Sequence, residues 1–182
     1  MNKSDLIRAF VAVKMPEKIS EELENFLSEV RPLANIKWVR FGQFHITLKF
    51  LGELEPDIIS RVKKSLMPLK YFEPFSINLS YIGAFPNLNS PRVIWLSGEE
   101  GAKELSRLSK KVNEILYEDE EIPKDEKKFK AHLTLARLKS GILSEELVRK
   151  LGTVQNFLWR CDELFLIRSE LTTKGPIYTD IL

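Results

Sequence analysis

The sequence of 182 residues predicts an α+β fold with two pseudo-symmetric lobes of mainly antiparallel sheet and flanking helices around a central cleft. Three observations support this prediction. Helical and strand periods are mixed along the chain, and several strands are joined by short turns, which favours antiparallel over parallel sheet. A His-x-Thr-Leu motif occurs once in each half, at His45 and His132. Because no Pro-, Ser- or Gly-rich linker divides the chain, we expect residues 1–182 to form a single two-lobed domain.

The first half of the chain predicts strands that alternate with helices. Residues 6–13 are apolar and β-branched, as in a strand. Pro16 then opens a helix with apolar residues at helical spacing over 19–30. The short segment IKWV leads to the strand with the first histidine, which ends at Gly52. Pro56 opens the second helix, whose apolar residues again recur every three or four positions.

The second half predicts further strands around two helices. FSINLSYIGAF and RVIWLSG predict one strand each, bounded by Asn, Ser and Pro turn signals. A third helix follows over 105–116, and then the charge-dense segment YEDEEIPKDEKKFK, which is typical of a solvated loop. The strand with the second histidine precedes a short helix near 144–150. CDELFLIRSEL and GPIYTDIL predict the last two strands.

The composition narrows the class of protein. The chain carries 28 Lys and Arg against 26 Asp and Glu, and this net charge of +2 permits nucleic acid as a partner without requiring it. The single cysteine, Cys161, excludes an internal disulfide and suits a reducing compartment. Arg8 interrupts the apolar run near the start, so no signal peptide is predicted, and nowhere do about 18 apolar residues follow one another. We expect a cytoplasmic protein, a monomer, with no membrane partner.

The His-x-Thr-Leu motif places polar and apolar side chains on opposite faces of a strand. Successive side chains alternate, so His45 and Thr47 share one face while Ile46 lies on the other. The same argument puts His132 beside Thr134. A polar face is costly to bury without a polar partner. We therefore expect the two polar faces to meet across a wet cleft between the lobes.

Two imidazoles that flank one small substrate suit acid–base chemistry, because an unperturbed histidine titrates at about pH 6.5. One can remove a proton while the other donates one. A threonine hydroxyl on the same face can donate to a phosphoryl oxygen as negative charge builds there. The pattern therefore indicates cleavage of a phosphate ester by water. Strict alternation also places Gln43, Lys49 and Lys130 on the histidine faces.

Three other interpretations of the motif pair stay open. Both histidines could be structural residues, although a repeat of the same frame by chance is improbable. A zinc site would need three or four protein ligands, and neither motif offers a nearby Cys, Asp or Glu on the histidine face. Cys161 as a nucleophile lacks a recognisable local signature. We predict no metal and no cofactor.

Five segments resemble the two-histidine (2H) phosphoesterase superfamily, and within it the bacterial and archaeal 2′-5′ RNA ligase-like proteins: RAFVAVKMP, FHITLKFLGE, PRVIWL, AHLTLARL and SELTTKGPIY. The paired motifs are the specific part of this resemblance. It implies two lobes of antiparallel sheet around a catalytic cleft, no metal, and hydrolysis of an RNA 2′,3′-cyclic phosphate to a 2′-phosphate. The implied partner is an RNA end that carries a cyclic phosphate.

The resemblance also implies roles for individual residues. His45 would be the proton donor to the leaving 3′ oxygen. His132 would be the proton acceptor that activates the attacking water. Thr47 and Thr134 would hold the phosphoryl oxygens.

Arg137 and Phe50 each lie five positions after a motif histidine, where the family places an arginine near the phosphate and an aromatic ring against the nucleoside. An odd offset puts a side chain on the opposite face of a regular strand, so each residue needs a bulge or a strand end to reach the cleft. Strict alternation instead nominates Lys49 and Lys130 as substrate-binding residues.

Two functions other than hydrolysis stay open. The same site could run in reverse and join RNA through a 2′-5′ linkage, because an enzyme catalyses both directions of one equilibrium. A module without turnover could capture RNA ends, although Arg and Lys would serve binding alone better than neutral imidazoles.

Overall fold

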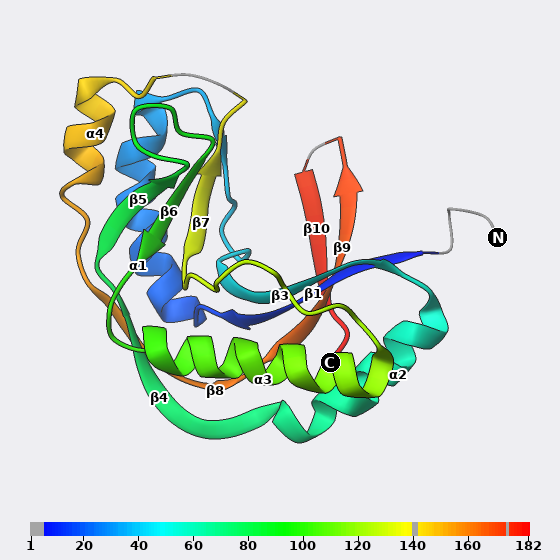
Figure 1. Ribbon diagram of the computed structural model, residues 1–182. Coiled ribbons are helices and arrows are strands. Elements are labelled where there is room, and N and C mark those ends of the chain that lie inside the picture. Colours follow the sequence, from blue (N-terminus) through cyan, green and yellow to red (C-terminus); the bar gives the residue numbers. More distant parts are fainter. Residues whose placement is uncertain (1–5, 140–141, 174) are drawn as a thin grey trace.

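The computed structural model describes residues 6–139, 142–173 and 175–182 (Figure 1). Its α-helices are α1 (Glu17–Val30), α2 (Pro56–Leu66), α3 (Ala102–Glu120) and α4 (Glu145–Leu151), and short 3-10 turns extend α1 over Arg31–Leu33 and α2 over Met67–Leu69. Its strands are β1 (Ile7–Lys14), β2 (Lys37–Trp38), β3 (His45–Leu54), β4 (Tyr71–Leu79), β5 (Tyr81–Phe85), β6 (Val93–Ser97), β7 (Leu133–Arg137), β8 (Phe157–Glu163), β9 (Phe165–Thr172) and β10 (Gly175–Asp180).

The main sheet of the described chain has eight strands in the order β10-β9-β1-β3-β7-β6-β5, with β2 also paired to β7. A second sheet pairs β4 with β8. All of these pairings are antiparallel, as predicted. β3 and β7 are joined only through the pair Ile46 and Leu133. Beyond this point the two halves of the sheet separate, so that β9 and β10 rise on one side and β7 on the other (Figure 1).

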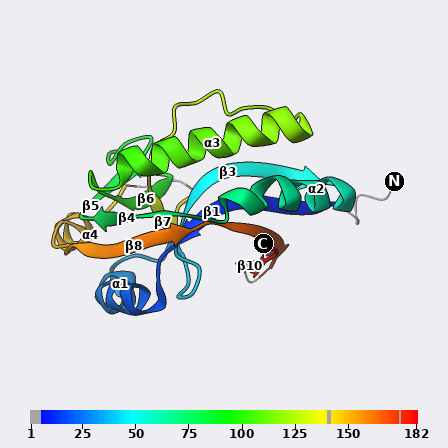
Figure 2. The same ribbon diagram turned by 90° about the horizontal axis from the view of Figure 1, so that it is seen from below.

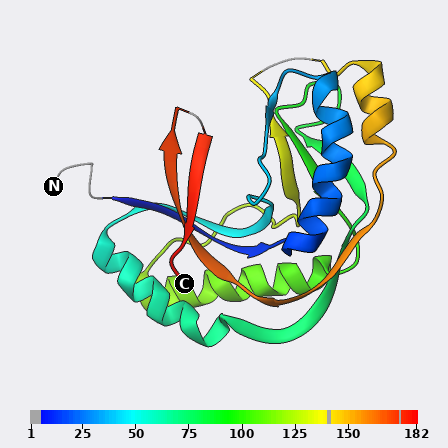
Figure 3. The same cartoon turned by 180° about the vertical axis from the view of Figure 1, so that it is seen from behind.

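The two halves of the chain repeat one order of elements. The first half runs β1-α1-β3-α2-β4, apart from the short β2, and the second runs β6-α3-β7-α4-β8. In each half the first strand pairs with the motif strand, and β4 pairs with β8 across the repeat. The helices also pack crosswise, α1 against α4 and α2 against α3 (Figures 2 and 3). This exchange of partners gives the fold its pseudo-two-fold symmetry.

The main core lies behind the face of the sheet that carries the motif histidines. Helix α1 buries Leu23 and Leu27 in it, and α2 buries Ile59 and Val62. The helices therefore pack through the apolar spacing that predicted them. Leu133 of β7 is fully buried in the same cluster. Both halves of the sheet thus share one continuous core.

Two strand predictions need correction. FSINLSYIGAF is not one strand but parts of β4 and β5, which belong to different sheets and are separated at Ser80. CDELFLIRSEL likewise divides at Leu164 between β8 and β9. The backbone N–H of Ser80 donates to Ser97 O, and that of Leu164 donates to Lys70 O, so each chain turns toward a new partner strand. No Gly or Pro marks either turn, which is why the apolar pattern reads as continuous.

The charge-dense segment begins inside a helix rather than in a loop. Its first residues, Tyr117 to Glu120, form the last turn of α3. Glu121 then adopts a positive φ of 54°, and its N–H donates to the carbonyl of Tyr117. Acidic residues propagate a helix well, so the helix continues until this left-handed residue ends it. No described helix is both long and apolar enough to cross a membrane.

Candidate active site

Both motifs open into one cleft of about 930 Å³. His45, Thr47, His132 and Thr134 all line it, while the intervening Ile46 is buried on the opposite face. The alternation predicted for the first residues of each motif is therefore present. The cleft lies where the two halves of the sheet separate, so each half supplies one imidazole and one hydroxyl.

Each motif strand contains a bulge three positions after its histidine. In β3 the register against β1 skips Leu48, and in β7 the register against β6 skips Leu135. A bulge adds one residue to one strand and so reverses the alternation beyond it. Phe50 and Arg137 consequently line the cleft despite their odd offsets. The bulges repeat at equivalent positions in the two halves.

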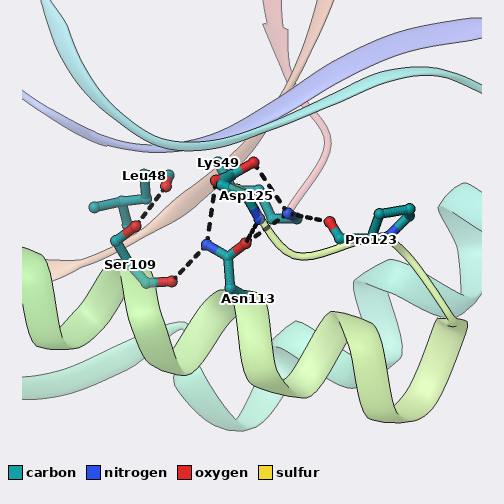
Figure 4. Close-up of polar contacts among 6 residues, drawn as sticks. All are labelled: Leu48, Lys49, Ser109, Asn113, Pro123 and Asp125. Atoms are coloured by element: carbon teal, nitrogen blue, oxygen red, sulfur yellow. Dashed lines mark hydrogen bonds and ion pairs between the residues drawn. The ribbon is translucent and has the colours of Figure 1, made fainter. Parts of the chain in front are cut away.

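The bulge also overturns the expectation that Lys49 shares a face with His45. The side chain of Lys49 is 1% exposed and points away from the cleft. Its Nζ donates to Asn113 Oδ1 at 2.6 Å and to the carbonyl of Pro123 at 2.8 Å, and lies 3.4 Å from Asp125 Oδ1 (Figure 4). Lys49 thus holds the segment between α3 and β7 against the back of β3.

The carbonyls of the two bulged residues find partners outside the strand ladder. Ser109 Oγ, on α3, donates to Leu48 O at 2.7 Å (Figure 4). The backbone N–H of Val39, just after β2, donates to Leu135 O at 2.8 Å. An unpaired buried carbonyl would cost free energy, so these contacts stabilise the two bulges.

Lys49→Met should lower the free energy of unfolding by about 1–3 kcal/mol, because it leaves Asn113 Oδ1 and the Pro123 carbonyl without their charged donor. Urea unfolding measures this difference. The matched control is Lys103→Met on the exposed face of α3, which should stay within about 0.5 kcal/mol of wild type. Equal stability of the two variants would contradict the stabilising role of this network.

Lys130 is exposed beside the second motif and does not line the cleft. Its Nζ lies 4.2 Å from the centre of the Trp95 ring and 5.3 Å from that of Phe85. Lys130, which was predicted to bind substrate, therefore lies on an aromatic surface next to the cleft rather than inside it. Gln43 does line the cleft, and its Nε2 donates to Pro176 O at 2.8 Å.

Both imidazoles are oriented in the same way. His45 Nδ1 lies 2.7 Å from the carbonyl of Gln43, and His132 Nδ1 lies 2.7 Å from that of Lys130. A carbonyl oxygen only accepts, so Nδ1 carries the hydrogen in each ring. In the neutral form Nε2 then keeps its lone pair. Each histidine is thereby fixed by the backbone two residues before it.

The surroundings favour the neutral form of both imidazoles. Burial lowers the pKa of His45 to about 4, against the raising effect of its bond to Gln43 O. The charge of Arg137 lowers it further. The rings of Phe10 and Tyr178 lie 4.8 and 5.4 Å from that of His45. Burial is also the main cause that lowers the pKa of His132.

Several residues that line the cleft were not predicted from the sequence as site residues. They come from β1, β2, the β2–β3 connection and β10: Arg8, Lys37, Trp38, Arg40 and Tyr178. None belongs to a motif. Only the pairing of distant segments brings these residues close to the histidines. No local sequence pattern predicts that placement.

Cys161 has no place in the cleft. It is 4% exposed on β8, opposite Phe75 of β4. Burial raises the pKa of its thiol to about 12. Since the thiolate is the nucleophile, the alternative of catalysis by Cys161 is unsupported.

The chain matches the family described as LigT like Phosphoesterase twice, over residues 13–95 and 96–178, with one motif in each match. It is 37% identical over 177 residues to a protein of Aquifex aeolicus named RNA 2′,3′-cyclic phosphodiesterase, covering 96% of this chain and 94% of that one. A protein of the same name from Archaeoglobus fulgidus is 35% identical, with 96% and 98% covered.

A solved structure shows the same fold. The crystal structure of TT0787 from Thermus thermophilus superimposes with a TM-score of 0.78 at 34% identity, covering 96% of this chain and 95% of that one. The double match agrees with the internal repeat read from the two His-x-Thr-Leu motifs and with the crosswise packing of the helices. On these matches, the chain belongs to the LigT-like phosphoesterases, a family of the 2H phosphoesterases.

Proposed function

We propose that this protein is a hydrolase that opens the 2′,3′-cyclic phosphate at the end of an RNA to leave a 2′-phosphate. The observation that carries the proposal is the pair of equally oriented imidazoles, His45 and His132, in one cleft. The name shared by the relatives from Aquifex aeolicus and Archaeoglobus fulgidus supports the same reaction. That shared name does not favour the alternatives, which are ligation of RNA and binding of RNA ends without turnover.

In the proposed reaction one imidazole accepts a proton and the other donates one. His132 Nε2 takes a proton from water as the water oxygen attacks phosphorus. The bond between phosphorus and the 3′ oxygen breaks, and His45 Nε2 protonates that oxygen. The products are a 3′-hydroxyl and a 2′-phosphate. The pair ends with its proton moved from His45 to His132, and exchange with solvent restores it.

The phosphoryl oxygens need donors as negative charge grows in the transition state. Thr47 and Thr134 each place one hydroxyl on the cleft, and Arg137 lies beside them beyond its bulge. A guanidinium offers two parallel donors to a phosphate. We propose that these three residues hold the phosphate between the imidazoles and that Phe50, 63% exposed at the cleft, contacts the nucleoside.

A product assay tests the function directly. The protein is incubated with a 2′,3′-cyclic mononucleotide and with a short RNA that ends in a cyclic phosphate, and the position of the product phosphate is determined. The 2′-phosphate is expected, with and without a chelator. We propose that the reaction needs no metal, because the two imidazoles can carry out both proton transfers themselves. A 3′-phosphate product, or loss of turnover in chelator, contradicts the proposal.

The kcat/KM for a cyclic phosphate should be bell-shaped in pH, with its maximum below about pH 6.5. The pair is active with one proton, and the free-protein pKa values of both His45 and His132 are lowered. Above the higher of the two pKa values, each rise of one pH unit removes about nine tenths of the singly protonated, active form. A bound phosphate anion raises both pKa values, so the profile of kcat should lie at higher pH than that of kcat/KM.

Rates from pH 4 to 9, on a substrate that does not titrate in this range, measure both profiles. A maximum of kcat/KM above pH 7.5 would show that the free protein keeps its proton more strongly than the burial of the imidazoles allows.

We also propose that the protein works in the cytoplasm as a monomer. The unpaired, buried thiol of Cys161 fits a reducing compartment. Cell fractionation and light scattering of the purified protein test the two statements.

A further inference from the structure

Two cationic residues, Lys37 and Arg137, are paired at the C-terminal end of β7. In the pairing of β2 with β7, Lys37 stands directly opposite Arg137. Directly opposite residues of an antiparallel pair point to the same face, and both of these line the cleft. Like charges in this position destabilise a sheet unless an anion lies between or beside them. The arrangement therefore favours an anionic ligand at this place.

The cleft holds more positive charge than a cyclic phosphate needs. Among the residues that the structure describes, its lining includes the cations Arg8, Lys37, Arg40 and Arg137, but no Asp or Glu. In the described part of the chain Arg8, Lys37 and Arg137 form no ion pair with a carboxylate. A cyclic phosphate is a diester with a single negative charge. The remaining positive charge matches further phosphates of a longer substrate.

The cleft also has room for more than one nucleotide. Its volume of about 930 Å³ is near the upper end of the range of about 300–1,000 Å³ for small-molecule sites. Trp38 follows Lys37 directly and lines the same cleft. Its Nε1 donates to Ala34 O at 3.2 Å, which fixes the ring. A fixed aromatic ring next to a cation is a common platform for a single-stranded nucleic acid.

We propose that Lys37 binds the phosphodiester that joins the terminal nucleotide to the one before it. Arg137 serves the cyclic phosphate, and Lys37, its neighbour across the strand pair, serves the next phosphate of the same chain. The preferred substrates are then oligonucleotides with at least one internal phosphate, rather than cyclic mononucleotides. This inference rests on the proposed function and extends it to the length of the substrate.

Three substrates test the proposal in the wild-type protein. They are a 2′,3′-cyclic mononucleotide, a dinucleotide that ends in a 2′,3′-cyclic phosphate, and the same dinucleotide with a neutral methylphosphonate as its internal linkage. The charged dinucleotide should have a kcat/KM about tenfold above that of its neutral analogue, the effect of one charge-assisted hydrogen bond. Equal values for the two dinucleotides overturn the proposal.

The variant Lys37→Gln assigns the effect to one side chain. It should lose about tenfold on the charged dinucleotide and change little on the mononucleotide and the neutral dinucleotide. The substitution and the methylphosphonate remove the same interaction, so their effects should not add. The control is Lys103→Gln, which makes the same change of charge at an exposed position of α3 outside the cleft. This control should match wild type on all three substrates. An equal loss on all three substrates, or additive effects, contradicts a phosphate contact by Lys37.

The mononucleotide separates this proposal from the proposed function. If the wild type hydrolyses the cyclic mononucleotide but does not distinguish the two dinucleotides, the function stands and the phosphate site is wrong. If it hydrolyses none of the three substrates, the proposed function itself fails.

Discussion

His45→Ala and His132→Ala should each lower kcat/KM for a cyclic phosphate by at least about a hundredfold. Each removes one of the two proposed proton-transfer groups, and general acid–base catalysis contributes about 10²- to 10⁴-fold. His45 is the first residue of β3 and His132 directly precedes β7, and the apolar faces of both strands stay intact, so the variants should fold. Steady-state rates, together with thermal unfolding as a check on folding, measure the effect. Activity equal to wild type in both variants would end the catalytic interpretation of the motif pair.

The roles of the two histidines can be separated by the leaving group. A phosphodiester with a phenolate leaving group of low pKa needs no proton from an acid. Such a substrate should rescue His45→Ala substantially and His132→Ala hardly at all, because the attacking water still needs a base. Rescue of the other variant would keep the reaction and exchange the two roles.

Arg137→Gln should lower kcat by about 10²- to 10³-fold, as loss of a donor to developing negative charge does in other enzymes. The glutamine keeps a polar side chain but not the charge or the two parallel donors. The control is Arg107→Gln, since Arg107 is 80% exposed on α3 and lies outside the cleft. Arg137→Lys should fall between Arg137→Gln and wild type. A rise in KM with unchanged kcat would instead show that Arg137 binds substrate and transition state equally.

The geometry of the motifs follows from the sequence only as far as the bulges. His45 and Thr47 share a face because regular alternation holds over these residues. At Leu48 the strand gains an extra residue, and the residues directly after it face the opposite way. Lys49 therefore enters the core and Phe50 reaches the cleft. The bulges lie at Leu-Lys in one motif and Leu-Ala in the other, and neither pair has a glycine or proline that would signal one.

The helices were predictable because each shows an apolar stripe and begins near Pro16, Pro56, Gly101 or Ser144. The residues from other segments that complete the cleft could not be predicted from the sequence. Tyr178, for example, lies on β10, which reaches the cleft only through β9 and β1. Their placement depends on the order of strands in the sheet, and this order is a property of the whole chain.

The repeated bulges give the two motifs equivalent positions with different occupants. At the fifth position after the histidine, one half presents Phe50 and the other presents Arg137. With identical occupants, a two-fold pair of His-Thr strands could receive a substrate in two opposite directions, and each histidine would be acid in half of the encounters. With the roles proposed above, a ring on one side and a cation on the other would allow only one direction. In the proposed reaction the two motifs supply the proton-transfer pair, and the difference between Phe50 and Arg137 at equivalent positions gives the cleft a polarity, so that each imidazole would meet the same end of the substrate.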